Sequence, residues 1–176
     1  MSIQMERGMG MQENVDGRKQ ALTAMVETYG QELYRFCCVQ LRDAHLAQDA
    51  VQETFLRAFR YYESFRHECS EKTWLFTICV RVCRNLRRSA WFRLVDRSVQ
   101  AENIGSVFVP EGNDLFSAVM ELDEKYRVCL VLHYYYGYKT QEIGTILCIP
   151  AGTVLTRLKR GREKLKNILT EGGEEP

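Results

Sequence analysis

The chain has 176 residues, 45% of them hydrophobic, and a formal net charge of +1. This length suits one domain or two small ones, the composition is normal for a packed globular protein, and the overall charge gives no sign of a nucleic-acid partner. The seven cysteines are odd in number and irregularly spaced. Their pattern argues against a disulfide framework and for free thiols in a reducing cytoplasm.

The N-terminal segment MSIQMERGMGMQENVDG has no apolar stretch, so it is neither a signal peptide nor a membrane span. We expect residues 1–17 to be a disordered lead. No other stretch approaches the roughly 18 apolar residues that a membrane-spanning helix needs, so no membrane insertion is expected.

The next segment predicts three helices that form a first domain over residues 18–90. Apolar residues recur at helical spacing from Leu22 to Cys37, which predicts a helix over 18–42. A second helix is predicted over 46–62. After the polar loop ESFRHECSEK, a third helix is predicted over about 72–90.

The second predicted helix exposes a leucine among acidic and amide groups. Its buried face is formed by Ala47, Val51, Phe55, Ala58 and Tyr62. The opposite face carries Asp49, Gln52, Glu53, Leu56 and Arg60. Single exposed leucines are common and can be merely solvated. Here the surrounding polar side chains favour a protein-docking surface.

The third predicted helix separates an apolar side from a basic side. The apolar side holds Leu75, Cys79, Val82, Cys83 and Leu86. The basic side holds Thr77, Arg81, Arg84 and Arg88, flanked by Trp74 and Asn85. Guanidinium groups hold phosphates while bases stack on aromatic rings, so this side suits single-stranded or melted nucleic acid. For Trp74 itself, a role as a core anchor is the favoured alternative.

Cys79 and Cys83 also raise the question of a metal site, because they could in principle bind zinc together with His67 and Cys69. They point to the apolar side of the helix, and no paired CxxC motif is present. Buried core thiols are therefore the favoured interpretation. We expect no metal and no cofactor.

Residues 91–112 lack a sustained period and carry Gly105, Pro110 and Gly112, so they are predicted to be a flexible linker. A second helical domain is predicted over residues 113–170, followed by a disordered tail at 171–176. No strand pairs and no internal repeat are recognisable. The predicted fold class is all-α, with two small helical domains joined by the linker.

The second domain contains a helix-turn-helix pattern. One helix ends at Gly137, a short helix follows Thr140, the sequence IPAG makes a turn, and Thr153 leads into the last helix. A helix, a short turn and a second helix, with a small residue near the turn, is the pattern whose second helix enters the DNA major groove.

The last helix is strongly basic, with six basic residues against Glu163 alone between positions 155 and 167. Its apolar face consists of Val154, Leu158, Gly161, Leu165, Ile168 and Leu169. Thr156, Lys159 and Arg160 lie opposite and near the N-terminal end, where residues that read bases must sit, while Arg157 at the border suits phosphate. A basic face that is merely solvated is the alternative.

Three stretches, in this order, resemble the extracytoplasmic-function subfamily of bacterial RNA polymerase sigma factors. They are AQDAVQETFLRAFRYYESFR, TWLFTICVRVCRN and EIGTILCIPAGTVLTRLKRGREKL. The resemblance covers residues 20–170. It implies an alternative sigma factor, not an enzyme, that binds core RNA polymerase and directs promoter-specific transcription initiation. It also implies an anti-sigma factor as a further partner.

The resemblance assigns roles to single residues. The first domain corresponds to sigma region 2, whose docking helix contacts the clamp of the largest polymerase subunit, here through Asp49, Gln52, Glu53 and Leu56. Recognition of the melted −10 element is implied for Phe65, Trp74, Thr77, Arg81, Arg84, Asn85 and Arg88. The second domain corresponds to region 4, which contacts the polymerase flap and reads the −35 element, here through Thr140, Thr153, Thr156, Arg157, Lys159 and Arg160.

Two positions depart from the family pattern and affect the expected promoter preference. Family members commonly carry an Asn in place of Arg81 and a basic residue in place of Leu155. A stand-alone helix-turn-helix regulator is the alternative function, and it would need a dimer surface to bind two half-sites. Enzymatic activity has little support, because none of His45, His67 and His133 stands in a nucleophile or metal pattern.

Overall fold

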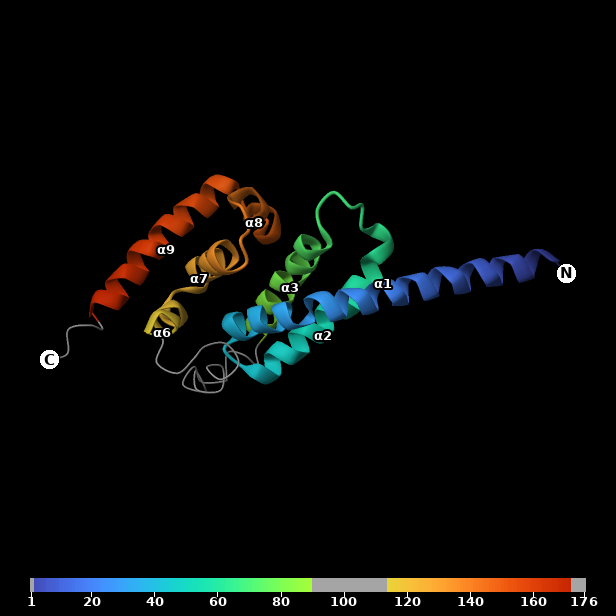
Figure 1. Cartoon of the computed structure of the whole chain (residues 1–176), viewed down its shortest axis with the longest axis horizontal. Helices are drawn as coiled ribbons and strands as arrows, with labels where there is room; N and C mark the ends of the chain where they lie inside the picture. Colours follow the sequence, from blue (N-terminus) through green and yellow to red (C-terminus); the bar gives the residue numbers. More distant parts are fainter. Residues whose placement is uncertain (1, 90–113, 172–176) are drawn as a thin grey trace.

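The computed structural model describes the backbone of residues 2–89 and 114–171, and the side chains of residues 16–89 and 114–170. Every regular element in these ranges is helical, which confirms the predicted all-α class (Figure 1). The long helices are α1 (Ser2–Leu41), α2 (Ala44–Tyr61), α3 (Glu71–Arg88) and α9 (Ala151–Glu171). The shorter ones are α6 (Asp114–Glu121), α7 (Glu124–Leu130) and α8 (Thr140–Leu147), with a 3₁₀ turn at Tyr62–Ser64 and a π-helical turn at Val131–Tyr135.

The ends of the chain differ in part from the expected boundaries. Helix α1 begins at Ser2, so the backbone of residues 2–17 is helical where a disordered lead was expected. Met, Gln and Glu supply seven of these residues and have high helix propensity even where no apolar face is present. The predicted linker and residues 172–176 of the predicted tail lie outside the described residues.

Helices α1, α2 and α3 form the first half of the molecule. The break between α1 and α2 is set by Arg42, which adopts a left-handed conformation with φ of 58°, and by Asp43. The Asp43 side chain accepts a hydrogen bond of 2.8 Å from the backbone N–H of Leu46 and so caps α2. Fully buried residues from all three helices form the core, among them Leu33, Phe36, Ala47, Ala50, Leu75 and Phe76.

Helices α6 to α9 form the second half, in which α9 packs on α7. Val154 and Leu158 on α9 are 0% and 4% exposed. Gly161 follows on the same face, and a Cβ atom there would lie 3.1 Å from Leu130 Cδ1 and 3.3 Å from Tyr126 Cβ. The absence of a side chain at Gly161 therefore lets α9 approach α7 closely.

Arg127 on α7 is almost fully buried, which the apolar periodicity of the sequence did not predict. Its Nη1 donates hydrogen bonds to the carbonyl oxygens of Met120 (3.1 Å) and Leu122 (2.9 Å) at the end of α6. Burial lowers the pKa of Arg127 to about 9, which is still above neutral pH, so the guanidinium stays charged. This side chain ties α6 to α7 by occupying carbonyls that the helix end leaves without partners.

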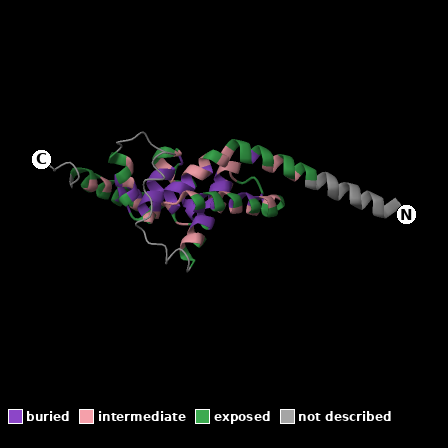
Figure 2. Ribbon diagram, turned by 90° about the horizontal axis from the view of Figure 1, so that it is seen from below, coloured by how far each residue is buried: buried purple, intermediate pink, exposed green. Residues whose placement is uncertain are grey.

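The two halves pack against each other and share one continuous core. The ring of Phe76 on α3 contacts Phe36 in its own half and Tyr136 and Tyr138 in the other, with centroid distances of 5.2, 4.9 and 5.5 Å. The Tyr136 hydroxyl donates a hydrogen bond of 2.9 Å to the backbone carbonyl of Glu32. Figure 2 shows that the buried residues gather in the middle of the molecule, where the halves meet.

Two ion pairs flank this shared core. Lys72 Nζ lies 2.8 Å from Glu32 Oε2 within the first half, beside the rings of Tyr136 and Tyr138. Arg87 Nη1 on α3 lies 2.6 Å from Glu124 Oε1 on α7 and links the halves directly. Helix α3 is thus the main element through which the first half contacts the second, and α1 adds the contacts of Glu32 and Phe36 with Tyr136.

Candidate protein and nucleic-acid interfaces

The outward face of α2 carries the predicted docking residues. Asp49, Gln52 and Leu56 are exposed, and the Leu56 side chain is 52% exposed. Glu53 is half-buried, and its Oε1 accepts a hydrogen bond of 2.6 Å from Arg57 Nε one turn further along α2. Because the apolar residues of α2 face the core, these side chains are not needed to hold the helix in place.

A groove of about 420 Å³ lies between this face of α2 and helix α3. All four predicted docking residues line it on the α2 side. Arg57, paired with Glu53, also lines it, helix α3 contributes Val82, Asn85 and Leu86, and Ser89 follows at its end. The groove combines an exposed leucine with carboxylate and amide groups, a combination that suits a protein partner with apolar and basic side chains.

The basic side of α3 is found where the sequence predicts it. Arg81, Asn85 and Arg88 are exposed, whereas Thr77 and Arg84 are half-buried. The Thr77 hydroxyl donates a hydrogen bond of 2.8 Å to the carbonyl of Thr73, one turn earlier. The apolar side of α3 is buried as predicted, with Leu75, Cys79, Val82 and Cys83 at most 3% exposed.

Phe65 and Trp74 stack on each other beside this basic side. Their ring centroids are 4.5 Å apart with an interplanar angle of 17°. Phe65 is only 8% exposed, and His67 covers it further at 4.4 Å between ring centroids. Trp74 is half-buried against the core, in line with its predicted role as a core anchor. In this conformation Phe65 offers little free ring surface to a nucleobase.

Arg81 brings the basic side of α3 into contact with the second half of the molecule. Its Nη2 lies 3.2 Å from the Sγ atom of Cys148, which follows the last residue of α8. The contact joins residues 67 positions apart in the sequence. The predicted −10 face of α3 and the turn of the predicted helix-turn-helix are therefore neighbours in this structure.

The turn between α8 and α9 is tight and depends on backbone groups. Cys148 adopts a left-handed conformation with φ of 55° and ψ of 49°, which ends α8. The N–H of Ile149 donates a hydrogen bond of 2.9 Å to the carbonyl of Gly144. A Cβ atom on Gly144 would lie 2.8 Å from the carbonyl oxygen of Ile149. Only glycine fits this close approach, which identifies Gly144 as the small residue near the turn.

Helix α9 presents its basic face to solvent as predicted. Thr156, Lys159 and Arg160 are exposed and Arg157 is half-buried at the border. Thr140 and Thr153, at the starts of α8 and α9, are half-buried. The one departure on the apolar face is Leu169, which is 38% exposed because α9 extends beyond α7 near its end.

Cys79 and Cys83 are buried as predicted, but they meet a residue that the sequence did not connect with them. Cys37 on α1 places its Sγ 3.3 Å from that of Cys79 and 3.6 Å from that of Cys83. Hydrogen bonding with Cys37, and to a smaller extent with Cys83, lowers the pKa of Cys79, and the contact with Cys79 raises the pKa of Cys37. The helical spacing within α3 predicted that Cys79 and Cys83 lie on one side. It could not predict the approach of Cys37, which precedes Cys79 by 42 residues in the sequence.

No helix in the described parts of the chain combines the length and the apolar character that a membrane span requires.

Two family models match the sequence. Residues 25–93 match sigma-70 region 2, and residues 113–165 match sigma-70 region 4. Together the two matches cover both halves of the structure and more than half of the chain.

Curated proteins similar to this chain carry the same assignment. The ECF RNA polymerase sigma factor SigW of Bacillus subtilis is 31% identical, over 88% of this chain and 92% of its own. The ECF RNA polymerase sigma factor SigL of Mycobacterium tuberculosis is 30% identical, over 86% and 90%. The RNA polymerase sigma-H factor of Pseudomonas aeruginosa is 28% identical, over 87% and 88%.

Two solved structures share the fold. The sigma factor RpoE of Bartonella quintana, solved with the anti-sigma factor NepR, matches with a TM-score of 0.67 and 22% identity, over 86% of this chain and 96% of its own. CnrH, solved with the cytosolic domain of CnrY, matches with a TM-score of 0.68 and 23% identity, over 90% and 94%. With sigma-70 regions 2 and 4 in order and relatives at 30% identity or more across most of its length, the chain belongs to the extracytoplasmic-function sigma factors of bacterial RNA polymerase.

Proposed function

We propose that this sigma factor divides its task among three helices: α2 docks on core RNA polymerase, α3 binds the melted −10 element, and α9 reads the −35 element. The observation that carries the proposal is the geometry of α8 and α9. The short turn fixed at Gly144 leaves Thr156, Lys159 and Arg160 exposed on the side of α9 opposite its buried face. This is the arrangement in which a recognition helix enters the major groove.

The groove beside Leu56 supports the docking role of α2, with the clamp of the polymerase's largest subunit as the partner and the flap as the partner of region 4. The arginines of α3 support binding to a melted strand, because Arg81 and Arg88 are exposed there. Since Phe65 is covered by Trp74 and His67, capture of a flipped base by Phe65 requires the loop before α3 to move.

The contact between Arg81 and Cys148 supports a further part of the proposal. The −10 face of α3 and the turn of the helix-turn-helix touch each other here, whereas −10 and −35 elements lie apart on a promoter. The halves must therefore separate when the protein binds polymerase and promoter. The free chain is accordingly expected to bind duplex DNA weakly and with a steep salt dependence, since phosphate contacts would dominate.

A reconstituted transcription assay tests the function as a whole. The purified chain is added to core RNA polymerase, and run-off transcription is measured on a promoter library randomised in the −10 and −35 elements. We expect a stable holoenzyme and transcripts from a defined subset of promoters. A chain that neither binds core polymerase nor directs initiation would overturn the proposal, and tight binding of the free chain to a palindromic duplex would favour the stand-alone regulator.

The docking role predicts the behaviour of a double variant on α2. Asp49→Ala combined with Gln52→Ala is expected to weaken core polymerase binding at least about tenfold, because charged and amide contacts at a docking surface are lost. Both residues are exposed, so helical content should stay unchanged. Glu27→Ala on α1, which also removes one exposed carboxylate, is the control and should leave polymerase affinity unchanged. Equal affinities of wild type and double variant would remove α2 from the interface.

The reading role predicts a difference between two basic residues of α9. Arg160 is exposed in the N-terminal part of the helix, where its guanidinium can bond guanine O6 and N7. Arg160→Ala is expected to cost about 1–3 kcal/mol at one base position and to relax selection there. Lys166→Ala, an exposed position more than one turn further on, should weaken all promoters about equally or have no effect. Unchanged −35 preference in Arg160→Ala would shift the contact face toward Arg157 and Arg162.

The proposal includes the setting in which the protein works. We place it in the cytoplasm, where its polymerase and DNA partners are found, and we assign it no catalytic activity of its own. We also propose regulation by an anti-sigma factor. Support for that partner comes from the sigma factor RpoE of Bartonella quintana, which shares the fold and was solved with the anti-sigma factor NepR.

A further inference from the structure

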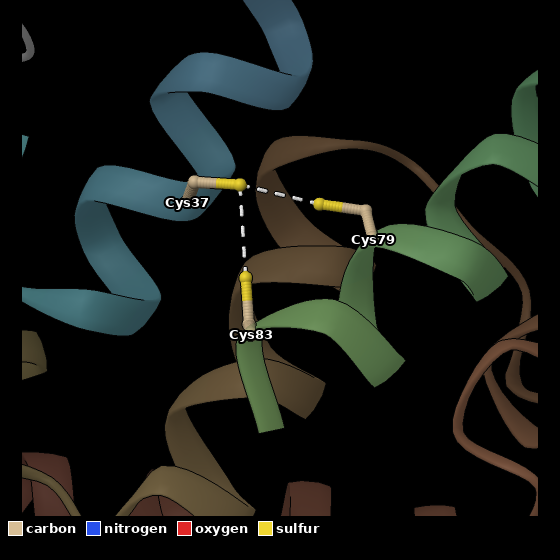
Figure 3. A group of neighbouring side chains, drawn as sticks. All are labelled: Cys37, Cys79 and Cys83. Carbon is tan, nitrogen blue, oxygen red and sulfur yellow. Dashed lines mark hydrogen bonds between the residues drawn. The ribbon is translucent and has the colours of Figure 1, made fainter. Parts of the chain in front are cut away.

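Three buried sulfur atoms converge inside the first half of the molecule. Cys37 comes from α1, and Cys79 and Cys83 come from successive turns of α3 (Figure 3). The figure shows the three side chains pointing toward a common centre between the two helices. All three Sγ atoms lie within 4.8 Å of one another, and the three residues are at most 3% exposed.

The distances match those of a metal site. A thiolate sulfur binds a metal ion at about 2.3 Å, so sulfurs that share one ion lie roughly 3.8–4.0 Å apart, the lower value for tetrahedral and the higher for planar geometry. The Sγ atom of Cys37 lies 3.3 Å from that of Cys79 and 3.6 Å from that of Cys83, so these two distances need to lengthen by only a few tenths of an ångström. The third distance, between Cys79 and Cys83, is at most 4.8 Å. Two ligands four residues apart on α3 already have the spacing that one face of a helix requires.

A disulfide or ordinary packing accounts for this arrangement less well. A disulfide would use two of the three sulfurs and leave the third without a role. A single buried cysteine is an ordinary small apolar side chain. Cys38 and Cys129 are such cases, since both are fully buried and neither belongs to a group of potential ligands in the described part of the chain. The three sulfurs at one point therefore form a set of potential metal ligands.

The donor set indicates which class of ion fits. Three thiolates with no carboxylate or imidazole among them select soft metal ions such as Cu(I), and Zn(II) second. Structural zinc sites are almost always four-coordinate, whereas monovalent copper accepts three sulfur ligands. The hydroxyl of Thr54 lies beside Cys79 and donates a hydrogen bond of 2.6 Å to the carbonyl of Ala50, but a neutral hydroxyl is a hard donor that soft ions do not select. This leaves coordination by three sulfurs as the best fit.

We propose that Cys37, Cys79 and Cys83 bind one thiophilic metal ion, Cu(I) in preference to Zn(II), which clamps α1 to α3. Binding releases the three thiol protons, because the thiolate is the form that holds a metal ion, and the single charge of Cu(I) offsets one of the three thiolate charges. The site lies next to Phe36, which contacts Phe76 and Tyr136 at the junction of the halves. Loading therefore stabilises the first half and the surface that the second half packs on.

A competition titration of the reduced full-length chain tests the site. Cu(I) is supplied anaerobically with bathocuproine disulfonate as the competing chelator, and Zn(II) is titrated separately. We expect one Cu(I) per chain, an increase in Tm on loading, and weaker binding of Zn(II). Cys37→Ala, Cys79→Ala and Cys83→Ala should each lower Cu(I) affinity by more than about 100-fold, because each removes a direct ligand.

Cys38→Ala and Cys129→Ala are matched controls, since they remove thiols that are as deeply buried as Cys37. Both should retain wild-type affinity, and an equal loss in either would overturn the proposal. Should a ligand variant fail to fold, X-ray absorption at the copper edge of the loaded wild type decides independently. Three sulfur neighbours at about 2.3 Å support the site. Two sulfurs, nitrogen or oxygen ligands, or a disulfide between these cysteines with no metal uptake, would refute it.

Discussion

Phe76→Ala is expected to lower the free energy of unfolding by about 4 kcal/mol and to let the two halves separate. The ring is fully buried and contacts Phe36, Tyr136 and Tyr138 at once. Truncating a buried phenylalanine costs about 3–5 kcal/mol because a cavity replaces the ring, and edge-to-face ring pairs are lost as well. The loss is a large part of the stability of a typical domain. Denaturant unfolding and small-angle X-ray scattering measure the two effects.

The control for this variant is Phe55→Ala in the core of the first half. Phe55 on α2 is also buried, at 7% exposure, so the cost in stability should be of similar size. Its removal should leave the radius of gyration unchanged, whereas Phe76→Ala should increase it. An unchanged radius in Phe76→Ala would mean that the ion pair of Arg87 with Glu124 and the hydrogen bond of Tyr136 hold the halves together without the ring.

Val154→Asp is expected to unfold the second half while the helices of the first half persist. Val154 is 0% exposed at the start of α9, within the shared core. The substitution loses about 1.5–3 kcal/mol of burial and adds the cost of desolvating a carboxylate in the core, several kcal/mol more. We expect a total above about 4 kcal/mol. Hydrogen exchange should show loss of protection in α7 to α9 and retained protection in α2.

Leu155→Asp provides a direct comparison at the neighbouring position. Leu155 is 57% exposed, so the same new side chain stays in water there. The free energy of unfolding should change by no more than about 0.5 kcal/mol. DNA binding by the holoenzyme should still weaken, because a negative charge is added to a basic face. Similar unfolding of both variants would contradict the assigned faces of α9.

Periodicity was sufficient to predict most of the helices and their faces, but not the start of α1 at Ser2 or the division between α6 and α7. Each apolar face borders a single core, so spacing at every third or fourth position identifies it, and this holds for α2, α3 and most of α9. The helix-turn-helix was also predictable, because Gly144 and the IPAG turn are local signals. The assigned roles of single residues in polymerase and promoter binding remain predictions, since they concern contacts outside the chain.

Features that depend on distant positions could not be predicted in the same way. The approach of Cys37 to Cys79 and Cys83 is set by the packing of α1 on α3, to which no local pattern corresponds. The shared core is another case, because Phe76 appears in the sequence as an ordinary apolar residue of one helix. Arg127 is buried because two carbonyls at the end of α6 accept its hydrogen bonds, although composition alone would place an arginine at the surface.

The hydrogen bond from Tyr136 to Glu32 also bears on the order in which the molecule folds. It joins residues 104 positions apart, whereas α1, α2 and α3 follow one another closely in the sequence. Closing a loop of that length costs about 4 kcal/mol in chain entropy, so the junction forms after the local helix pairs. On the ribosome the N-terminal half is also made first. For part of its synthesis, the ring of Phe76 therefore lacks Tyr136 and Tyr138, and the half-made chain exposes an apolar surface that a chaperone can bind.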